Sequence, residues 1–394
     1  MKTVKPNIVI AFLEKTNKTM DTLPSSIGNT VFKNLTYLKR LLQFCMEDEN
    51  FLQHINGLPL LLTEDGMLRK FDSKNPVFLT PYSKLLPSQP ELFVHRELLP
   101  LFSTFSPGDT LKSGVFKRFD TASIEPFLMQ IFPSSWLASD RHVVWQPSQT
   151  SVPSVEWLTT LWELILTTYN DRKSSFESDE DATRILRPLE DWPIIPTSKG
   201  TLVPVSLGKT VLDLNPRVYD DDKITRILCR LGGSQLDFTP LRGINKDLAV
   251  QIVSPHLANP YNRQDFINVL HYLSRGDDFK CHLGHGEIVT LLRFLQEDTT
   301  TVYNNTSLLN KLPVYKRLNG TLVSLDSYAF SCVVDLPRCV SLINIEDRID
   351  GESCVFLEAI QEIEPLYNAL RIPRLSQVDE FVRSEERRVG KECR

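Results

Sequence analysis

The sequence lacks several features that would assign it to a well-defined class. No apolar run is long enough to span a bilayer, and the short run at residues 8–13 is too brief for a secretory signal. The seven cysteines are scattered, odd in number and contain no Cys-x-x-Cys pair. This usage predicts a cytoplasmic protein whose thiols are reduced.

The chain also lacks an excess of positive charge. Its 44 Lys and Arg are outnumbered by 49 Asp and Glu, which leaves a formal net charge of −5. Phosphate binding favours clustered cations, so we expect no nucleic-acid partner, and the absent apolar spans predict no membrane partner. The 394 residues are 41% hydrophobic and 24% charged, which is ordinary for a globular protein of two or three domains.

What the chain does contain is an internal repeat. Three times an apolar segment reaches a Pro, and a Gly follows seven residues later. We call these segments the first, second and third hairpins, at residues 57–68, 191–202 and 311–322. Their Pro and Gly pairs are Pro59 and Gly66, Pro193 and Gly200, and Pro313 and Gly320. A repeat of this kind governs the architecture and must be identified before any single residue is interpreted.

Each hairpin has the same neighbours along the sequence. Apolar residues flank each Gly, and the turn dipeptides Asp-Gly and Asn-Gly are strong signals for a tight hairpin. A third apolar segment follows, with Phe78, Leu212 and Cys332 each twelve residues past the Gly. A helical apolar period precedes each hairpin, and two more helices are predicted near residues 246–257 and 263–274. We therefore expect an α+β fold of repeated units, each a helix, a three-stranded antiparallel hairpin element and a helix, stacked as an extended array.

This pattern divides the chain into five parts. Residues 1–30 are unassigned, and the three repeat units are expected at residues 31–150, 151–240 and 241–382, the last with the two bridging helices. Residues 383–394 are charged and without apolar period, and are interpreted as a non-native tail. An acidic stretch at residues 171–181 is expected to be a surface insertion whose serines, Ser174, Ser175 and Ser178, are available for phosphorylation.

The hairpin sequences resemble the large repeats of the sacsin family. The resemblance is carried by residues 58–72 with 75–79, by residues 192–197 and by residues 312–315, and it extends over about residues 30–382. It implies a cytosolic chaperone system in which an ATPase-like domain precedes each such region. The implied partners are unfolded or cytoskeletal client proteins and heat-shock chaperones.

Two short motifs suggest nucleotide binding, and both are incomplete. Gly284-His285-Gly286 is the Gly-x-Gly of this chain, but His282 stands where the related chaperone ATPases need an Asp. Residues 206–210, Ser-Leu-Gly-Lys-Thr, match the end of a phosphate-binding loop, but Val203 occupies the position of its first glycine. No helix is predicted after Thr210, so we expect no bound nucleotide and no other cofactor.

The sequence contains no complete metal or nucleophile set. Cys281, His282 and His285 lie within five residues, but four ligands are normal for structural zinc, and only His256 and His271 are near in sequence. No Gly-x-Ser-x-Gly elbow occurs. We therefore expect no metal site, no catalytic residue and no enzymatic activity. The interpretation is a non-enzymatic segment of a sacsin-like chaperone scaffold, which holds clients or co-chaperones or transmits motion of a neighbouring ATPase-like domain. The alternatives are a degenerate chaperone-type ATPase and a passive structural spacer.

Overall fold

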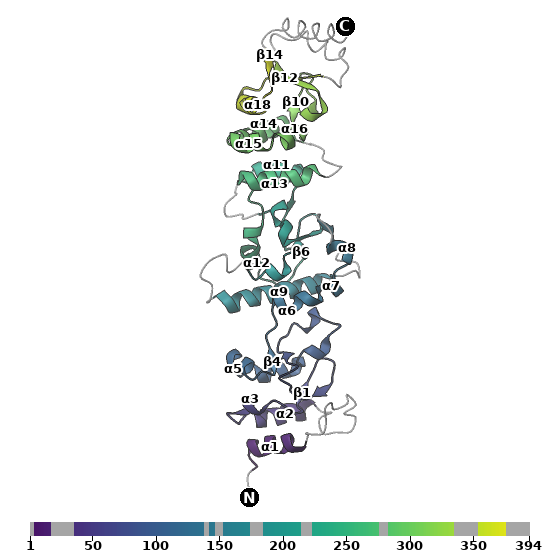
Figure 1. The fold of residues 1–394 in the computed structure, drawn as a ribbon, viewed down its shortest axis with the longest axis vertical. Helices are drawn as coiled ribbons and strands as arrows, with labels where there is room; N and C mark the ends of the chain where they lie inside the picture. Colours follow the sequence, from purple (N-terminus) through teal and green to yellow (C-terminus); the bar gives the residue numbers. More distant parts are fainter. Residues whose placement is uncertain are drawn as a thin grey trace. The chain divides into compact units, whose positions relative to one another are not determined.

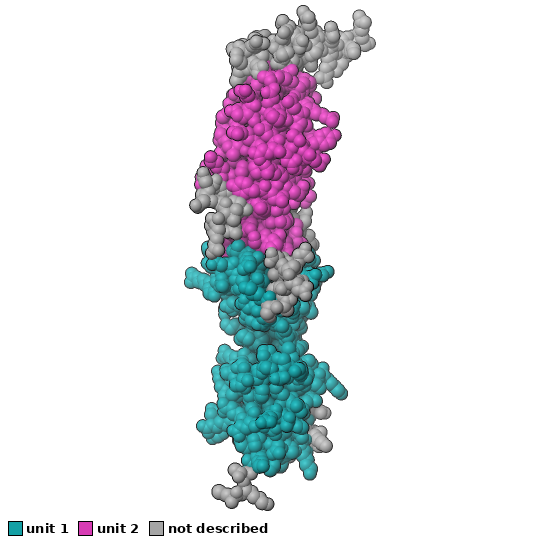
Figure 2. Space-filling model, turned by 90° about the vertical axis from the view of Figure 1, so that its left-hand side faces the viewer, with its two compact units in different colours: residues 1–139, 146–194, 239–252 teal, residues 140–145, 195–238, 253–394 magenta. Residues whose placement is uncertain are grey.

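The chain forms two compact units. The computed structural model describes residues 4–16, 35–137, 142–145, 153–173, 184–213, 223–275, 283–334 and 354–375. Unit 1 comprises residues 1–139, 146–194 and 239–252, and unit 2 comprises residues 140–145, 195–238 and 253–394 (Figure 2). The five-part division by repeated sequence is a different partition, and it stays a prediction.

Helices are the more abundant elements, and Figure 1 marks them along the chain. Those of eight residues or more are α1 (Pro6–Thr16), α2 (Leu35–Cys45), α9 (Val155–Arg172), α11 (Lys223–Arg230), α12 (Lys246–Val253), α13 (Arg263–Ser274) and α14 (His285–Gln296). The short ones are α3 (Phe51–His54), α4 (Leu99–Phe102), α5 (Pro107–Lys112), α6 (Thr121–Ile124), α7 (Leu128–Ile131), α8 (Ser134–Leu137), α15 (Thr299–Asn304), α16 (Thr306–Lys311) and α18 (Glu364–Ala369).

The strands are short and form small sheets. They are β1 (Leu61–Leu62), β2 (Leu68–Arg69), β3 (Val77–Phe78), β4 (Phe116–Lys117), β5 (Val143–Val144), β6 (Pro193–Pro196), β7 (Thr201–Pro204), β8 (Val211–Leu212), β9 (Ser234–Gln235), β10 (Tyr315–Lys316), β11 (Leu322–Val323), β12 (Phe330–Val334), β13 (Cys354–Glu358) and β14 (Arg374–Leu375). The mixed α+β class is confirmed.

The helix predicted before each hairpin is confirmed. α2, α9 and α14 each bury one apolar face at helical spacing. Ser154 begins α9 as its N-cap, because its side chain accepts a hydrogen bond from the backbone N–H of Trp157. The bridging helices are α12 and α13, as the sequence period predicts. Fully buried members of the three faces include Leu38, Leu42, Leu158, Leu161, Trp162, Ile288, Leu291 and Leu292.

The three hairpins share one turn geometry. Gly66, Gly200 and Gly320 have φ values of +77°, +66° and +88°, which a side chain would disfavour. In each turn a backbone N–H bonds to the carbonyl four residues on: Thr63 to Met67 at 3.0 Å, Thr197 to Thr201 at 3.0 Å, and Arg317 to Thr321 at 2.8 Å. The Pro-to-Gly spacing therefore corresponds to a repeated physical structure.

The prediction of a three-stranded antiparallel element is wrong. The third apolar segment (β3, β8 or β12) does not join its hairpin; it pairs in parallel with strands from further along the chain. β3 pairs with β4, β8 with β9, and β12 with both β13 and β14. The reason lies in burial, because both residues of β3 and of β8 are buried, and parallel strands are typically covered on both faces.

A downstream segment connects each hairpin to its third strand. In each turn, one backbone N–H donates to a carbonyl of this downstream segment. The bonds run from Glu64 to Phe93 (3.0 Å), from Ser198 to Gln235 (2.8 Å) and from Leu318 to Phe356 (3.2 Å). The same segments lie parallel to the third strands, at Phe78 and Phe93, Leu212 and Gln235, and Cys332 and Phe356. The repeated units are thus alike in hydrogen bonding; their stacking into an array stays a prediction.

The acidic insertion begins later than the sequence suggests. Helix α9 continues through Asp171 and Arg172, where the prediction placed a loop. Residues 174–183, which include the three serines, lie outside the described residues, as does the charged tail at 383–394. The described ranges contain no helix that is both long and apolar enough to cross a membrane.

Candidate functional site

The Gly-x-Gly motif forms the start of a helix. Gly284 is the N-cap of α14, and its N–H donates to Glu287 Oε2 at 2.8 Å. The Arg230 guanidinium donates to the same carboxylate oxygen at 2.7 Å. These contacts give Gly284 and Glu287 a structural role that satisfies the helix N-terminus. His282 lies outside the described residues.

The phosphate-loop-like motif at residues 206–210 is also used structurally. It forms the 3₁₀ helix η8 (Val205–Thr210) and leads directly into β8, so no α-helix N-terminus opens there. The Lys209 ammonium donates to the Leu257 carbonyl at 2.7 Å and to Asp265 Oδ2 at 3.0 Å. Asp265 is 9% exposed, and its Oδ2 also accepts from the Asn259 N–H at 3.0 Å. The lysine that would bind phosphate therefore ties η8 to α13.

The Cys-His cluster is only partly visible. Cys281 and His282 lie outside the described residues, and His285 begins α14. Within the described ranges no group of three or more His, Cys, Asp or Glu side chains is placed to hold a metal ion. Burial raises the pKa of the Cys45 thiol to about 11.

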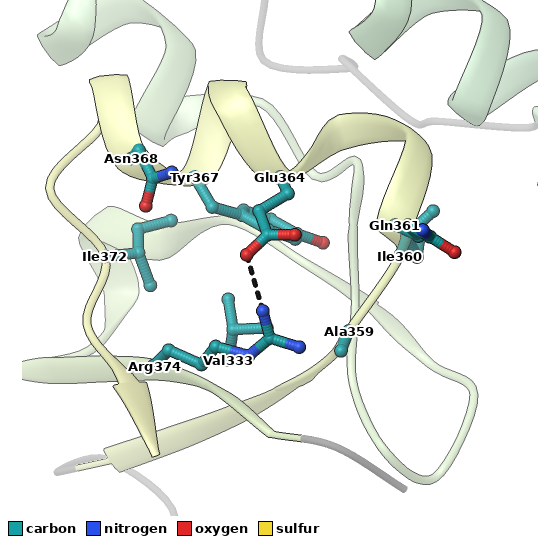
Figure 3. A pocket seen from close by; sticks show the side chains of 9 residues that line it. All are labelled: Val333, Ala359, Ile360, Gln361, Glu364, Tyr367, Asn368, Ile372 and Arg374. Atoms are coloured by element: carbon teal, nitrogen blue, oxygen red, sulfur yellow. Dashed lines mark hydrogen bonds and ion pairs between the residues drawn. The ribbon is translucent and has the colours of Figure 1, made fainter. Parts of the chain in front are cut away.

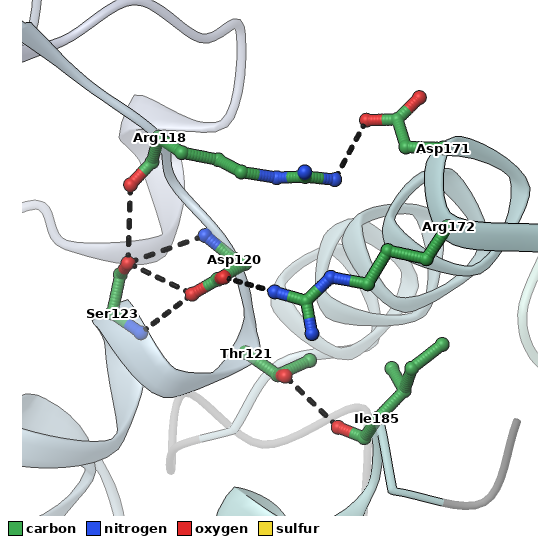
Figure 4. Close-up of polar contacts among 7 residues, drawn as sticks. All are labelled: Arg118, Asp120, Thr121, Ser123, Asp171, Arg172 and Ile185. Atoms are coloured by element: carbon green, nitrogen blue, oxygen red, sulfur yellow. Dashed lines mark hydrogen bonds and ion pairs between the residues drawn. The ribbon is translucent and has the colours of Figure 1, made fainter. Parts of the chain in front are cut away.

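A polar cluster that the sequence did not indicate ties α9 to the segment after β4 (Figure 4). The Arg172 guanidinium donates to Asp120 Oδ2 at 2.8 Å, and the Arg118 guanidinium donates to Asp171 at 3.1 Å. Asp120 also accepts from the backbone N–H of Ser123, as the N-cap of α6. We call these residues, with Thr121, the α9 clamp; the Thr121 hydroxyl donates to the Ile185 carbonyl at 2.9 Å.

Aromatic side chains also fix α9 to other segments. Trp157 Nε1 donates to the Leu85 carbonyl, and Trp162 Nε1 donates to the Ile194 carbonyl, both at 3.0 Å. The Tyr82 hydroxyl lies 2.7 Å from the Thr167 hydroxyl. Both indoles are buried. Helix α9 is therefore fixed along its length to several other segments of unit 1.

Unit 2 contains a pocket of about 330 Å³ beside α18 (Figure 3). Buried Val333, Ile360 and Ile372 contribute apolar surface, while Arg374 and Glu364 form an ion pair of 2.5 Å across it. The side chains of that pair are 47% and 46% exposed. No sequence motif indicated this pocket, although eight of its nine lining residues lie within residues 359–374 and only Val333 comes from another segment. The paired charges leave it without a net charge to attract a ligand.

His142 has a strongly shifted pKa. Its ring stacks on Tyr272 with centroids 4.5 Å apart, and its Nε2 lies 2.7 Å from Thr210 Oγ1. Burial, with a smaller contribution from the Lys199 charge, lowers the pKa of His142 from its ordinary value of 6.5 to about 4. The folded state thus favours the neutral ring.

This shift predicts an acid-sensitive contribution to stability. The unfolded chain takes up a proton near pH 6.5 and the folded chain only near pH 4, so the contribution is complete above pH 6.5 and lost as pH falls towards 4. The full loss is about 3 kcal/mol. Denaturant unfolding of His142→Phe between pH 7 and 4 should show a flatter decline than wild type. Replacing exposed His54 with Phe is the control; parallel curves for wild type and His142→Phe would contradict the prediction.

Comparison with known proteins finds a relative for most of this chain. No protein-family model matches the chain, and no solved structure matches it. Human sacsin is 27% identical over 374 residues, which cover 90% of this chain and 8% of sacsin. The chain thus spans a small fraction of the curated relative that it matches. Over nine tenths of its length, the chain is similar to a short region of sacsin.

Proposed function

We propose that the chain is a non-enzymatic frame segment of a sacsin-like chaperone, and that it transmits movement of a neighbouring ATPase-like domain. The observation that carries this proposal is the hydrogen-bond scheme common to the three hairpins, in which turn, downstream segment and third strand are connected in the same way. The α9 clamp and the tryptophan donors add further ties within unit 1. Elements tied in this manner move together, as transmission requires.

The distribution of exposed apolar side chains favours a frame role rather than a role in holding clients on a broad face. In the described ranges, the large apolar side chains with high exposure are spread along the chain, apart from Ile8 and Phe12 on α1 and Val4 just before it. Singly exposed apolar residues are normal on a soluble protein, whereas a client-binding face needs a contiguous patch of several hundred Å². The remaining exposed residues are Tyr37, Leu111, Met129, Val144, Tyr261 and Tyr303.

The ATPase alternative is weakened by how its candidate residues are used. Lys209 is bonded to Leu257 and Asp265, and Gly284 caps α14. We therefore expect 5 mM Mg-ATP to leave the thermal unfolding midpoint unchanged. A ligand at about one hundred times its Kd stabilises a protein by roughly 2.7 kcal/mol, so a rise of a few degrees would reveal a nucleotide site. Mg-ADP and Mg²⁺ alone serve as controls.

A second experiment distinguishes a frame segment from a segment that holds client proteins. Residues 1–382 are added to a heat-unfolded client, and light scattering is followed with and without Mg-ATP, after circular dichroism has shown that the protein is folded. A frame leaves aggregation unchanged. Suppression that is indifferent to ATP would instead support client holding, and suppression that depends on ATP would overturn the non-enzymatic assignment.

A further inference from the structure

Two of the hairpins carry the same tetrapeptide in their second strands. Gly-Thr-Leu-Val occurs at residues 200–203 in the second hairpin and at residues 320–323 in the third. Both copies begin at the turn glycine, and both turns close with equivalent backbone hydrogen bonds. The first hairpin differs here, because Gly66 is followed by Met-Leu-Arg-Lys. A surface property of one tetrapeptide is therefore expected to apply to the other.

In the second hairpin, the outer edge of this tetrapeptide holds an additional strand. β5 pairs antiparallel with β7, with Val143 opposite Leu202 and Val144 opposite Thr201. The Trp145 N–H extends the pairing by donating to the Gly200 carbonyl at 2.9 Å. Leu202 and Val203 are both 0% exposed in this three-stranded sheet, whose order is β5-β7-β6.

In the third hairpin, the same edge has no strand beside it in the part of the chain that the structure describes. β10 and β11 form a two-stranded sheet, and Leu322 and Val323 are only half-buried. The Arg317 N–H donates to the Thr321 carbonyl and closes the turn, so the next opposed pair, Lys316 and Leu322, is a non-hydrogen-bonded one. The N–H and C=O of Leu322 therefore point away from β10, towards the open edge.

The first hairpin shows how such an edge is protected when it is not used. Arg69 stands at the position of Val203 and Val323, and its guanidinium pairs with Asp65 at 2.6 Å. Charged side chains on an edge strand discourage further pairing. The third hairpin has neither this charge nor a covering strand among the described residues. Its edge thus combines open backbone groups with partly exposed apolar side chains.

We propose that the outer edge of β11, residues 320–323, is a docking site for an extended peptide of β-branched and aromatic residues. The chain itself supplies an example of such an occupant in residues 142–145, His-Val-Val-Trp, which fill the same edge of the identical tetrapeptide in the second hairpin. Backbone hydrogen bonds supply affinity by strand addition, and apolar side chains cover Leu322 and Val323. The site goes beyond the frame role, because it would bind a short extended peptide at one strand edge rather than hold unfolded clients on a broad face.

The test uses a capped fluorescent peptide with the sequence of residues 141–147, titrated into the 394-residue protein. We expect saturable binding and slower hydrogen exchange at the Leu322 amide. A peptide N-methylated at the residue equivalent to Trp145 lacks the N–H that would bond to Gly320, and should bind about tenfold more weakly. N-methylation at the equivalent of Val144, whose N–H points away from the edge, is the matched control and should leave affinity unchanged.

Protein variants provide the second arm. Val323→Arg reproduces the protected edge of the first hairpin and should weaken binding several-fold, whereas Ser324→Arg adds the same charge beyond the strand and should not.

The proposal is overturned if no saturable binding occurs up to about 1 mM peptide. It is also overturned if both N-methylated peptides bind equally, or if exchange slows at Leu202 instead of Leu322. Dimerisation abolished by Val323→Arg, without peptide binding, would instead assign the edge to a second copy. None of these outcomes bears on the frame role, which the Mg-ATP and aggregation experiments test separately.

Discussion

Replacing Trp162 with alanine should lower the free energy of unfolding by about 3–5 kcal/mol. The indole is 0% exposed within α9, so its removal leaves a cavity that a tied helix cannot collapse to fill. Its Nε1 also donates to the Ile194 carbonyl at 3.0 Å, and the substitution leaves that buried acceptor without its partner. The measurement is urea unfolding followed by far-ultraviolet circular dichroism.

Two further variants separate the cavity from the hydrogen bond. Trp162→Phe keeps most of the apolar volume and removes only the donor, so we expect a smaller loss, of about 1–3 kcal/mol. Trp136→Ala removes a half-buried indole from α8 and is the matched control, with a loss well below that of Trp162→Ala. Equal losses for Trp162→Ala and Trp136→Ala would show that α9 does not organise unit 1.

Local sequence patterns predicted the elements of this fold well. The apolar period of α2, α9 and α14 is strong because each helix buries one face, and periodicity reports burial directly. The hairpins were equally clear, since a turn residue with positive φ favours glycine, as at Gly66, Gly200 and Gly320. Both signals act within a dozen residues, a range over which sequence and structure are closely linked.

Strand partners were not predictable in the same way. A buried apolar run such as β3 indicates a strand but not its neighbour, and the nearest hairpin was the wrong choice. Val77 pairs with Phe116, and the intervening residues contain no pattern that identifies this partner. The antiparallel third strand that does occur, β5, precedes its hairpin and is specific to one copy among the described residues. Tertiary burial on both faces decided the pairing.

For the candidate sites, too, local sequence patterns were informative and contacts between distant residues were not. In the motif at residues 206–210, the sequence shows that Val203 occupies the position of the first glycine, and the structure adds that Lys209 bonds to Leu257 and Asp265. The α9 clamp could not be predicted, since Arg118 and Asp171 are distant in sequence and each is an ordinary surface charge by itself. The Gly-Thr-Leu-Val identity was visible in the sequence. Its meaning required the structure, which shows that one copy has a covering strand.

Replacing Gly208 with alanine should destabilise the protein by about 1–3 kcal/mol, although the residue does not lie in a left-handed turn. A Cβ at this position would stand 2.6 Å from the His256 backbone oxygen and 3.2 Å from its carbonyl carbon. Because both atoms belong to the backbone, no rotamer change relieves the clash, and η8 must move away from the residues before Leu257. That movement would also stretch the Lys209 bonds to Leu257 and Asp265.

Gly286→Ala is the matched control for Gly208→Ala. Gly286 lies in the first turn of α14, and nothing stands within 4 Å of an added Cβ, so alanine should stabilise the helix by up to about 1 kcal/mol. The two substitutions add the same methyl group and should change the unfolding midpoint in opposite directions. They also distinguish a phosphate-binding role of residues 206–210 from a packing role. If Gly208 bound phosphate, its substitution would abolish a nucleotide-dependent shift of the unfolding midpoint. A glycine required for packing loses stability without any nucleotide, and Gly208→Ala with wild-type stability would contradict this packing role.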